Sequence, residues 1–266
     1  MITTSHKNIN LLQGRAADLI AELADADILA DLILLDPPWP YAKKISGSGV
    51  GASDHFPCMG FDEIMQDIKD SRGLCSPGGR ALLWSTNSQD PEIASHMRFE
   101  RKGSATTAHL GAWKWISGGA WVKPVRNRGA VYSEPAPGSP GMGFHGRSSE
   151  CEPWSYLTPD DTEEVIAKWK VLLGNSPHRR ADVPGVWTAR SLGHSQKPVD
   201  LLTRMITGWV PEGGVVLDLY AGWGSAAIAT LRAGGGRKYY GAEVFWPNAD
   251  RILERVREEV ENGPKD

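Results

Sequence analysis

The sequence lacks the features that would place it in a membrane or among secreted, disulfide-bonded proteins. No apolar run approaches the ~20 consecutive residues that a transmembrane helix requires. The N-terminal stretch MITTSHKNINLLQ has no basic segment followed by an apolar core, so we expect no secretory signal. The 3 cysteines are scattered and odd in number, which favours neither a disulfide framework nor a metal site. A reducing cytoplasm is the simplest location.

The chain also lacks the excess of positive charge that marks strongly basic nucleic-acid binders. Its 29 Lys and Arg stand against 32 Asp and Glu, which gives a net charge of -3. The charge is uneven, however, because seven basic residues and one acidic residue fall between Arg98 and Arg128. A solvated surface would explain such a run. The interleaved Trp113, Trp115 and Trp121 instead favour a site for phosphates and unstacked bases.

What is present is an alternation of buried strands and amphipathic helices in the two outer parts of the chain. We predict strands over 9–13, 31–35 and 81–86, and helices over 16–23 and 62–74, the latter closed by SPGGR at 76–80. The last third predicts a helix over 199–209, a strand ending at Asp218, a small-residue helix, a strand over 237–244 and a final helix capped by Asn248. This order is typical of an α/β sheet.

The middle of the chain, from about 105 to 190, has a different composition, rich in Gly, Pro, Trp and Ser. Short strands are expected in GGAWVKP (118–124) and GAVYSEP (129–135), and an amphipathic helix in TPDDTEEVIAKWKVLL (158–173). We interpret this region as an insert at the edge of the α/β domain.

A glycine turn lies between the buried strand VVLD and a helix of small residues. Gly222 and Gly224 would let the backbone approach a ligand at the positive end of that helix. Glu243 ends the next strand, where an acid can bind both hydroxyls of a ribose. A glycine turn alone is weak support, because many such turns need glycine for geometry. Turn and acid together indicate a cofactor that contains a nucleoside.

The turn departs from the dinucleotide pattern, because it lacks a third glycine and carries the bulky Trp223 between its two glycines. That bulk would crowd a diphosphate. A nucleoside without phosphate fits better, and S-adenosylmethionine is the obvious candidate.

The sequence Asp36-Pro37-Pro38-Trp39 follows the buried run 31–35. It thus lies at the carboxyl end of a strand, which is where open parallel sheets bind ligands. Two prolines make the turn stiff and leave its carbonyls as acceptors. An aspartate and a backbone carbonyl suit an exocyclic amino group, which has two protons to donate, and Trp39 offers a flat face for a base. The alternative is a strand end with a packed tryptophan.

These segments carry a resemblance to a known family. Asp36-Pro37-Pro38-Trp39 resembles the catalytic [D/N/S]-P-P-[Y/F/W] motif of amino-methyltransferases. DLYAGWGSAAIA (218–229) resembles their F-x-G-x-G cofactor loop, and HSQKP (194–198) resembles the H-x-x-K-P segment before it. The catalytic motif comes first, as in the β class of DNA amino-methyltransferases.

The resemblance implies a circularly permuted Rossmann-like fold that binds S-adenosylmethionine. It implies one methyltransferase domain over 1–266, with a catalytic and cofactor-binding core in 1–97 and 191–266 and a target-recognition insert in 98–190. WVKP (121–124) and SSECEPW (148–154) match the family more loosely.

The family's residue roles carry over position by position. Asp36 and the Pro37 carbonyl, supported by Pro38, would bind the target amino group, and Trp39 would stack on a flipped base. The cofactor would be held by the loop residues Asp218, Tyr220, Ala221, Gly222, Gly224 and Ser225, by Glu243 at the ribose, and by Gln196, Lys197 and Pro198 at the methionine end. Tyr220, Trp223, Ser225 and Arg15 depart from the residues common in the family.

Aspartate at the first motif position favours adenine-N6 methylation of double-stranded DNA. Cytosine-N4 methylation, adenosine-N6 methylation of RNA and a catalytically silent nucleic-acid-binding module remain alternatives, and a nicotinamide oxidoreductase fits the glycine turn poorly. Phosphate contacts are expected from Lys123, Arg126, Arg128, Arg179 and Arg180. The expected setting is a bacterial or phage-encoded cytoplasmic enzyme without a required restriction partner. A homodimer stays open.

Overall fold

The computed structural model describes residues 4–40, 59–84, 93, 95–102, 105–111, 113–122, 151–158, 186–188 and 196–263. The chain forms two compact units, one made of residues 1–76 and 195–266 and the other of residues 77–194. The elements of the first unit are β1 (Thr4–His6), β2 (Ile9–Gln13), α1 (Ala16–Asp25), β3 (Ala30–Leu35), α2 (Phe61–Ser71), the 3-10 turn η3 (Arg72–Leu74), α5 (Val199–Trp209), β10 (Val215–Asp218), α6 (Ser225–Ala233), β11 (Lys238–Glu243) and α7 (Trp246–Asn262).

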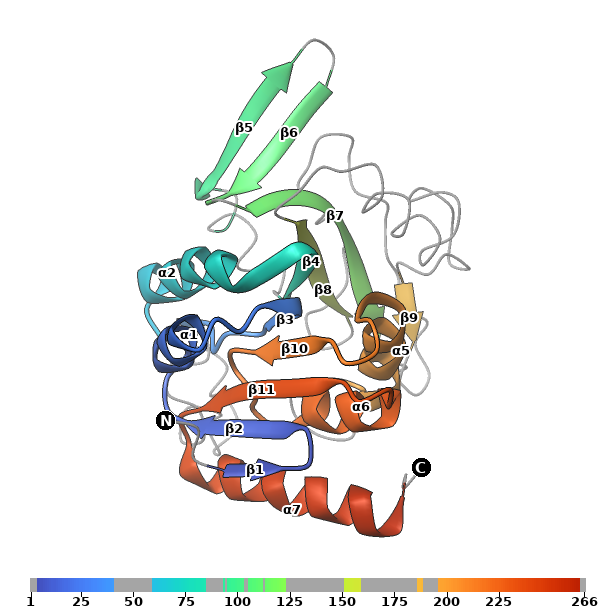
Figure 1. Ribbon diagram of the computed structural model, residues 1–266. Helices are drawn as coiled ribbons and strands as arrows, with labels where there is room; N and C mark the ends of the chain where they lie inside the picture. Colours follow the sequence, from blue (N-terminus) through green and yellow to red (C-terminus); the bar gives the residue numbers. More distant parts are fainter. Residues whose placement is uncertain are drawn as a thin grey trace, which may run out of the picture. The chain divides into compact units, whose positions relative to one another are not determined.

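The first unit contains a sheet in the order β1-β2-β11-β10-β3, in which only β1 is antiparallel to its neighbour. Strand β10 lies between β11 and β3, with Val216 opposite both Tyr239 and Leu32 (Figure 1). The predicted apolar runs form this centre, and Leu32, Ile33 and Val216 are each 0% exposed. Strands buried on both faces read as continuous apolar runs, which explains why β3 and β10 show no alternation.

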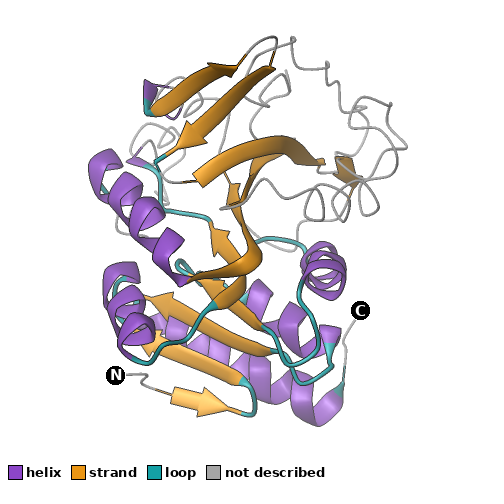
Figure 2. Ribbon diagram, turned by 45° about the horizontal axis from the view of Figure 1, so that its top comes forward, coloured by secondary structure: helices purple, strands orange, loops and turns teal. Residues whose placement is uncertain are grey.

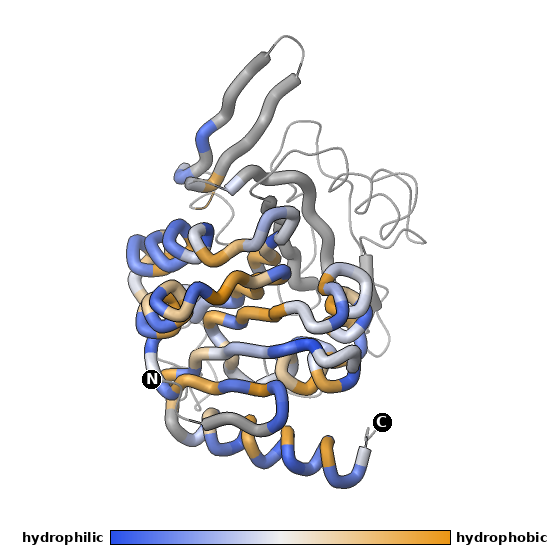
Figure 3. The backbone as a smooth tube through the Cα atoms, in the orientation of Figure 1, coloured by the Kyte–Doolittle hydropathy of each residue, from blue (hydrophilic) through white to orange (hydrophobic). Residues whose placement is uncertain are grey.

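Helices cover both faces of this sheet. Helices α1 and α2 pack against each other on one side, and α5, α6 and α7 pack together on the other side (Figure 2). Helix α7 alternates between hydrophilic and hydrophobic residues along its length (Figure 3), and Ile252 and Val256 are its most buried side chains. This i, i+4 spacing places both on the face toward the sheet. No helix within the described ranges is long and apolar enough to cross a membrane.

The second unit is built from strands whose bounds are β4 (Cys75–Trp84), which begins at the end of the first unit, β5 (Met97–Lys102), β6 (Ala105–Leu110), β7 (Trp113–Val122), β8 (Cys151–Thr158) and β9 (Val186–Thr188). They pair antiparallel in the order β4-β8-β7-β6-β5, and β9 pairs parallel with β7. Strand β7 contains most of the predicted strand at 118–124. Trp113 is 0% exposed, so the suggestion that it stacks on bases is wrong for this residue.

Two predicted boundaries are wrong. The segment SPGGR lies inside β4 and does not close the preceding helix, because the Ser76 hydroxyl donates to Asp31 Oδ1 at 3.1 Å and holds the chain beside the start of β3. Helix α7 begins at Trp246 with Phe245 as its N-cap, so Asn248 lies within the first turn. A proline in the first turn, where its fixed φ suits a helix start, accounts for the earlier beginning. The predicted strand at 129–135 and nearly all of the predicted helix at 158–173 lie outside the described residues.

Candidate active site

The proline motif and the glycine turn leave neighbouring strands at the same edge of the sheet. Asp36 directly follows β3, and residues 219–224 directly follow β10, which pairs parallel with β3. The Leu219 N–H donates to the Leu34 carbonyl at 3.2 Å, so the two turns begin side by side. Two segments far apart in the sequence therefore form one site at the carboxyl edge, where open parallel sheets bind ligands.

The motif itself is a tight turn. The Trp39 N–H donates to the Pro37 carbonyl at 2.9 Å, and the Met59 N–H donates to the Pro38 carbonyl at 3.2 Å. A carbonyl has two lone pairs, so Pro37 can accept a second hydrogen bond. Trp39 is 4% exposed, and its ring packs tilted on that of Phe61, with the ring centroids 5.7 Å apart. The tryptophan thus belongs to an aromatic pair that links the motif to the start of α2.

Lys197 contacts the proline motif directly. Its ammonium donates to Asp36 Oδ2 at 2.7 Å, and the lysine side chain is only 11% exposed. The resemblance alone placed Lys197 at the methionine end of a cofactor. No spacing rule could have revealed this contact, because 161 residues separate the two partners.

Glu243 joins the glycine turn to the end of β11. Its Oε2 accepts the Gly222 N–H at 2.8 Å and its Oε1 accepts the Phe245 N–H at 2.8 Å. Burial raises the pKa of this carboxyl, and the hydrogen bonds from Phe245, Gly222 and Asn248 lower it in part. Each carboxylate oxygen has a further lone pair, so Glu243 can hold the turn and still accept the hydroxyls of a ribose.

Glycine is needed at the two positions of the turn for different structural reasons. Gly224 has φ 72°, and a Cβ there would lie 2.8 Å from two atoms of Ile252 in α7. Gly222 has φ 52°, and a Cβ there would meet only the Tyr220 carbonyl oxygen, at 3.8 Å. Gly224 is therefore required by helix packing, whereas Gly222 faces open space that a ligand can approach.

Trp223, between the glycines, is held by α7. The Arg251 guanidinium lies over its ring, 4.6 Å from the centroid, and the Arg255 guanidinium hydrogen-bonds its carbonyl oxygen. This cation–π contact explains how a bulky residue is accommodated where the family commonly has a small one.

Asp218, the last residue of β10, is a buried acid below the turn. It accepts hydrogen bonds from the Tyr239 hydroxyl at 3.0 Å and from the Tyr220 N–H at 3.3 Å. Burial raises the pKa of Asp218 to about 7, although both hydrogen bonds lower it; Asp36 and Glu243 also contribute to the rise through their negative charge. These two hydrogen bonds join the end of β10 to the Tyr220 backbone and to β11.

Sequence reasoning missed Asp67 of α2. The Tyr220 hydroxyl donates to Asp67 Oδ2 at 2.8 Å, and Asp67 is 6% exposed. Burial raises the pKa of Asp67, and the hydrogen bond from Tyr220 lowers it in part. A signal was available, because Asp67 falls on the same helix face as the buried Ile64 and Ile68.

The remaining predicted residues frame the site or lie elsewhere. The Ala221 N–H donates to the Ala242 carbonyl at 2.8 Å, which ties the turn to β11. Ser225 is the first residue of α6 and is buried, and Pro198 is the N-cap of α5, preceded by the half-buried Gln196. The predicted phosphate contacts Lys123, Arg126, Arg128, Arg179 and Arg180 lie outside the described residues.

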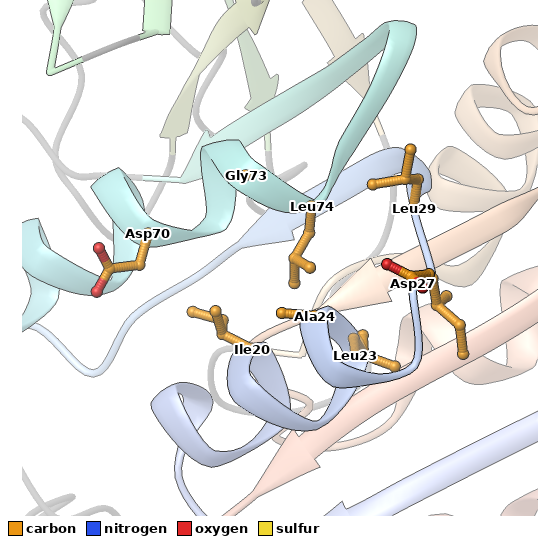
Figure 4. Close-up of a pocket in the computed structure, with 9 residues that line it drawn as sticks. Ile20, Leu23, Ala24, Asp27, Leu29, Asp70, Gly73 and Leu74 are labelled. Atoms are coloured by element: carbon orange, nitrogen blue, oxygen red, sulfur yellow. The ribbon is translucent and has the colours of Figure 1, made fainter.

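A separate cavity of about 200 Å³ lies in the first unit, beside α1 and η3. Ile20, Leu23 and Leu74 point into it, and Asp27 and Asp70 lie at its margin (Figure 4). None of its lining residues belongs to the proline motif or the glycine turn.

The hydrogen bonding of the glycine turn bears on the kind of ligand it suits. Phosphate-binding turns direct their backbone N–H groups at the anion. Here the Gly222 N–H donates to Glu243 and the Gly224 N–H donates to the Ala221 carbonyl at 2.7 Å. The turn therefore suits a nucleoside without phosphates.

Comparisons with known proteins agree with this geometry. Residues 154–247 match the family model described as DNA methylase (N6_N4_Mtase). No curated protein sequence matches the chain. The structure resembles that of the M1.HpyAVI–SAM complex, with a TM-score of 0.57 and 14% identity over 93% of this chain and 98% of that one.

Two further solved structures share the architecture. A DNA modification methylase from Thermus thermophilus has a TM-score of 0.52 and 18% identity, covering 97% of each chain. PvuII DNA methyltransferase, described as cytosine-N4-specific, has a TM-score of 0.51 and 12% identity over 98% of this chain and 95% of that one. At these identities the likeness establishes the fold, and the predicted Rossmann-like methyltransferase fold is confirmed.

Proposed function

We propose that this chain, which the family match and the shared fold place among the amino-methyltransferases, methylates the N6 amino group of adenine in double-stranded DNA with S-adenosylmethionine as the donor. The observation that carries the proposal is the pairing of β3 with β10. It brings Asp36 and the glycine turn to the same edge of one sheet.

The residues of the turn fit this donor. Glu243 accepts two backbone N–H groups and retains lone pairs for ribose hydroxyls, and the open space above Gly222 admits the ligand. The Gly222 and Gly224 N–H groups are already bonded within the protein, which suits a donor without phosphates. When bound, S-adenosylmethionine supplies a methyl group on a positively charged sulfur.

The proline motif provides the acceptors for the target base. An exocyclic amino group has two N–H bonds, and the Asp36 carboxylate with the Pro37 carbonyl can accept both. Holding the amino nitrogen in one orientation favours an in-line displacement, for which positioning supplies much of the rate. We propose that a base swung out of the duplex lies against this turn, which the Trp39–Phe61 pair supports from below.

Adenine is favoured over cytosine because an aspartate, and not a serine, stands first in the motif. Cytosine-N4 methylation is the second candidate, and one of the structures with the same fold is described as cytosine-N4-specific. We further propose that residues 98–190 recognise the target, and that the basic residues named for this role contact DNA phosphates: Lys123, Arg126, Arg128, Arg179 and Arg180.

The test is methyl transfer from a tritiated donor to plasmid DNA, followed by digestion to nucleosides and chromatography. We expect the label in N6-methyladenine, and loss of at least about 100-fold of the label with Asp36→Ala. Asp25→Ala, at an exposed position at the end of α1, is the matched control and should transfer like the wild type.

Each other outcome has a definite meaning. Label in N4-methylcytosine would assign the second candidate. Label absent from DNA but present in RNA would assign an RNA enzyme. Undiminished label with Asp36→Ala would refute the role of the motif, and no label in either nucleic acid would refute the function.

A further inference from the structure

We infer that Lys197 is the positioning residue of the target-base pocket, where its ammonium fixes the Asp36 carboxylate for the incoming amino group. This inference rests on the proposed function and adds a residue to the target side of the site. The resemblance assigned Lys197 only to the methionine end of the cofactor, on the opposite side of the methyl transfer.

The contact between Lys197 and Asp36 is a strong one. The Nζ to Oδ2 distance of 2.7 Å is that of a charge-assisted hydrogen bond. The lysine side chain is 11% exposed and the aspartate side chain 35% exposed, so water screens the pair only in part. A largely buried ammonium requires a counter-charge, and Asp36 supplies it.

The backbone of Lys197 is itself fixed. Pro198 follows it as the N-cap of α5, with φ −64°, and is buried. Helix α5 buries Leu202 and Ile206, and it contacts β3, the strand that Asp36 follows. The lysine and the aspartate are thus presented by two packed elements and not by independent loops, which is how a site holds its geometry.

The chemistry of the target explains why a cation beside Asp36 is useful. A carboxylate accepts hydrogen bonds only when it is ionised, whereas a protonated carboxyl also donates and would compete with an amino group. The ammonium favours the ionised form and occupies one of the lone-pair sites on Oδ2. The hydrogen bond thereby restrains the rotation of the carboxylate.

A role at the donor end alone predicts different behaviour from a role at Asp36. A lysine that only binds the donor would change the donor dissociation constant and leave the chemical step intact. A lysine that positions Asp36 would change kcat and the acid side of the pH–rate profile, and would leave donor binding almost unchanged.

The experiment compares Lys197→Met, Lys197→Arg and the control Lys69→Met, which removes an exposed lysine of α2. Donor dissociation constants are measured by calorimetry without DNA, and kcat is measured on plasmid DNA across the acid and alkaline limbs of the pH–rate profile. For Lys197→Met we expect a kcat about 100-fold lower, an acid limb displaced to higher pH and a donor dissociation constant within about threefold of the wild type. Lys197→Arg should recover most of the rate.

A double variant tests whether Lys197 acts through Asp36. In an Asp36→Asn background, Lys197→Met should cause no further loss of kcat, because the group it positions is absent. Thermal unfolding shows whether each variant is folded. If Lys197→Met is not folded, the comparison with the wild type is made with Lys197→Arg.

Two results would overturn the inference. One is a donor dissociation constant raised more than about tenfold in Lys197→Met with kcat and the acid limb unchanged. The other is independent, multiplicative losses in the double variant. Failure of the wild type to transfer methyl groups is a different result, because it refutes the proposed function and the inference with it.

Discussion

The hydroxyl of Tyr220, in the glycine turn, donates a 2.8 Å hydrogen bond to the buried carboxylate of Asp67 in α2. Helix α2 begins with Phe61, which packs on Trp39 of the proline motif. One helix therefore contacts both halves of the site. The F-x-G-x-G loop that the turn resembles has phenylalanine at this position, and phenylalanine could not donate this hydrogen bond.

We predict that Tyr220→Phe lowers the free energy of unfolding by about 1–3 kcal/mol, because it removes a donor from a buried carboxylate. Urea denaturation at neutral pH measures the change. The double variant Tyr220→Phe/Asp67→Leu removes the acid as well and should be more stable than Tyr220→Phe alone. Additive losses in the double variant would show that the two side chains do not act as a pair.

Asp218 gives the fold a predictable dependence on pH. Its pKa is raised to about 7, above the ordinary value of 3.8, chiefly by burial. The stabilisation associated with the neutral carboxyl is thus complete below about pH 4 and is lost as the pH rises through about 7, by up to roughly 4 kcal/mol. Urea unfolding between about pH 4 and 8 should show this fall in the wild type.

Asp218→Asn cannot titrate at this position. Its fall in unfolding free energy over the same pH range should therefore be smaller than that of the wild type by up to roughly 4 kcal/mol. The variant itself is expected to be less stable at about pH 4, because its amide nitrogen replaces an acceptor of the Tyr239 or Tyr220 hydrogen bond. Asp250→Asn, at an exposed position in α7, is the control and should follow the wild type. Parallel profiles for Asp218→Asn and the wild type would contradict the assignment.

Substitution of one glycine of the turn should mainly lower stability, and substitution of the other should mainly weaken donor binding. Gly224→Ala places a Cβ 2.8 Å from Ile252 at a positive φ, so we expect a loss of about 2–4 kcal/mol in unfolding free energy. Gly222→Ala meets no close atom and incurs only the strain of its φ, about 1 kcal/mol. Because the new methyl group projects into the space assigned to the donor, Gly222→Ala should bind the donor at least about tenfold more weakly by calorimetry. Equal effects of both variants on stability would refute this division.

Glu243→Gln should weaken donor binding about 10- to 100-fold and lower stability by about 1–2 kcal/mol. The amide nitrogen of glutamine cannot accept a hydrogen bond, so either Gly222 or Phe245 loses its partner, and the ribose loses an ionised acceptor. Calorimetry measures the first change and urea unfolding the second. Glu261→Gln, exposed near the end of α7, is the control. Unchanged donor affinity would remove Glu243 from the binding site.

The sequence predicted the core of the first unit well, because buried parallel strands and amphipathic helices leave local patterns. The runs that became β3 and β10, and the helix that became α5, were all recognisable from periodicity and proline position. The continuation of β4 through SPGGR was not, because it depends on the contact between Ser76 and Asp31. A proline and two glycines locally indicate a turn, and only the tertiary contact overrides them.

The candidate site shows the same division. The proline motif, the glycine turn and Glu243 are local signals placed at strand ends, and they could be found from sequence. The pairings that complete the site could not be predicted, because the contacts of Lys197 with Asp36 and of Tyr220 with Asp67 join residues 161 and 153 positions apart. Tertiary packing decides which polar side chain contacts which acid, and no short segment of the sequence specifies that packing.

The division of the first unit between the two ends of the chain also constrains how the protein can acquire activity during synthesis. The Val215 N–H donates to Asp31, 184 residues earlier, so β10 joins the sheet beside β3 only after the entire second unit has been translated. Such non-local pairing makes folding slow relative to proteins with local contacts. A ribosome-bound chain that carries the proline motif cannot yet hold a methyl donor. On the proposed function, an unfinished chain has the proline motif without the glycine turn, so it should transfer no methyl groups until the sheet is complete.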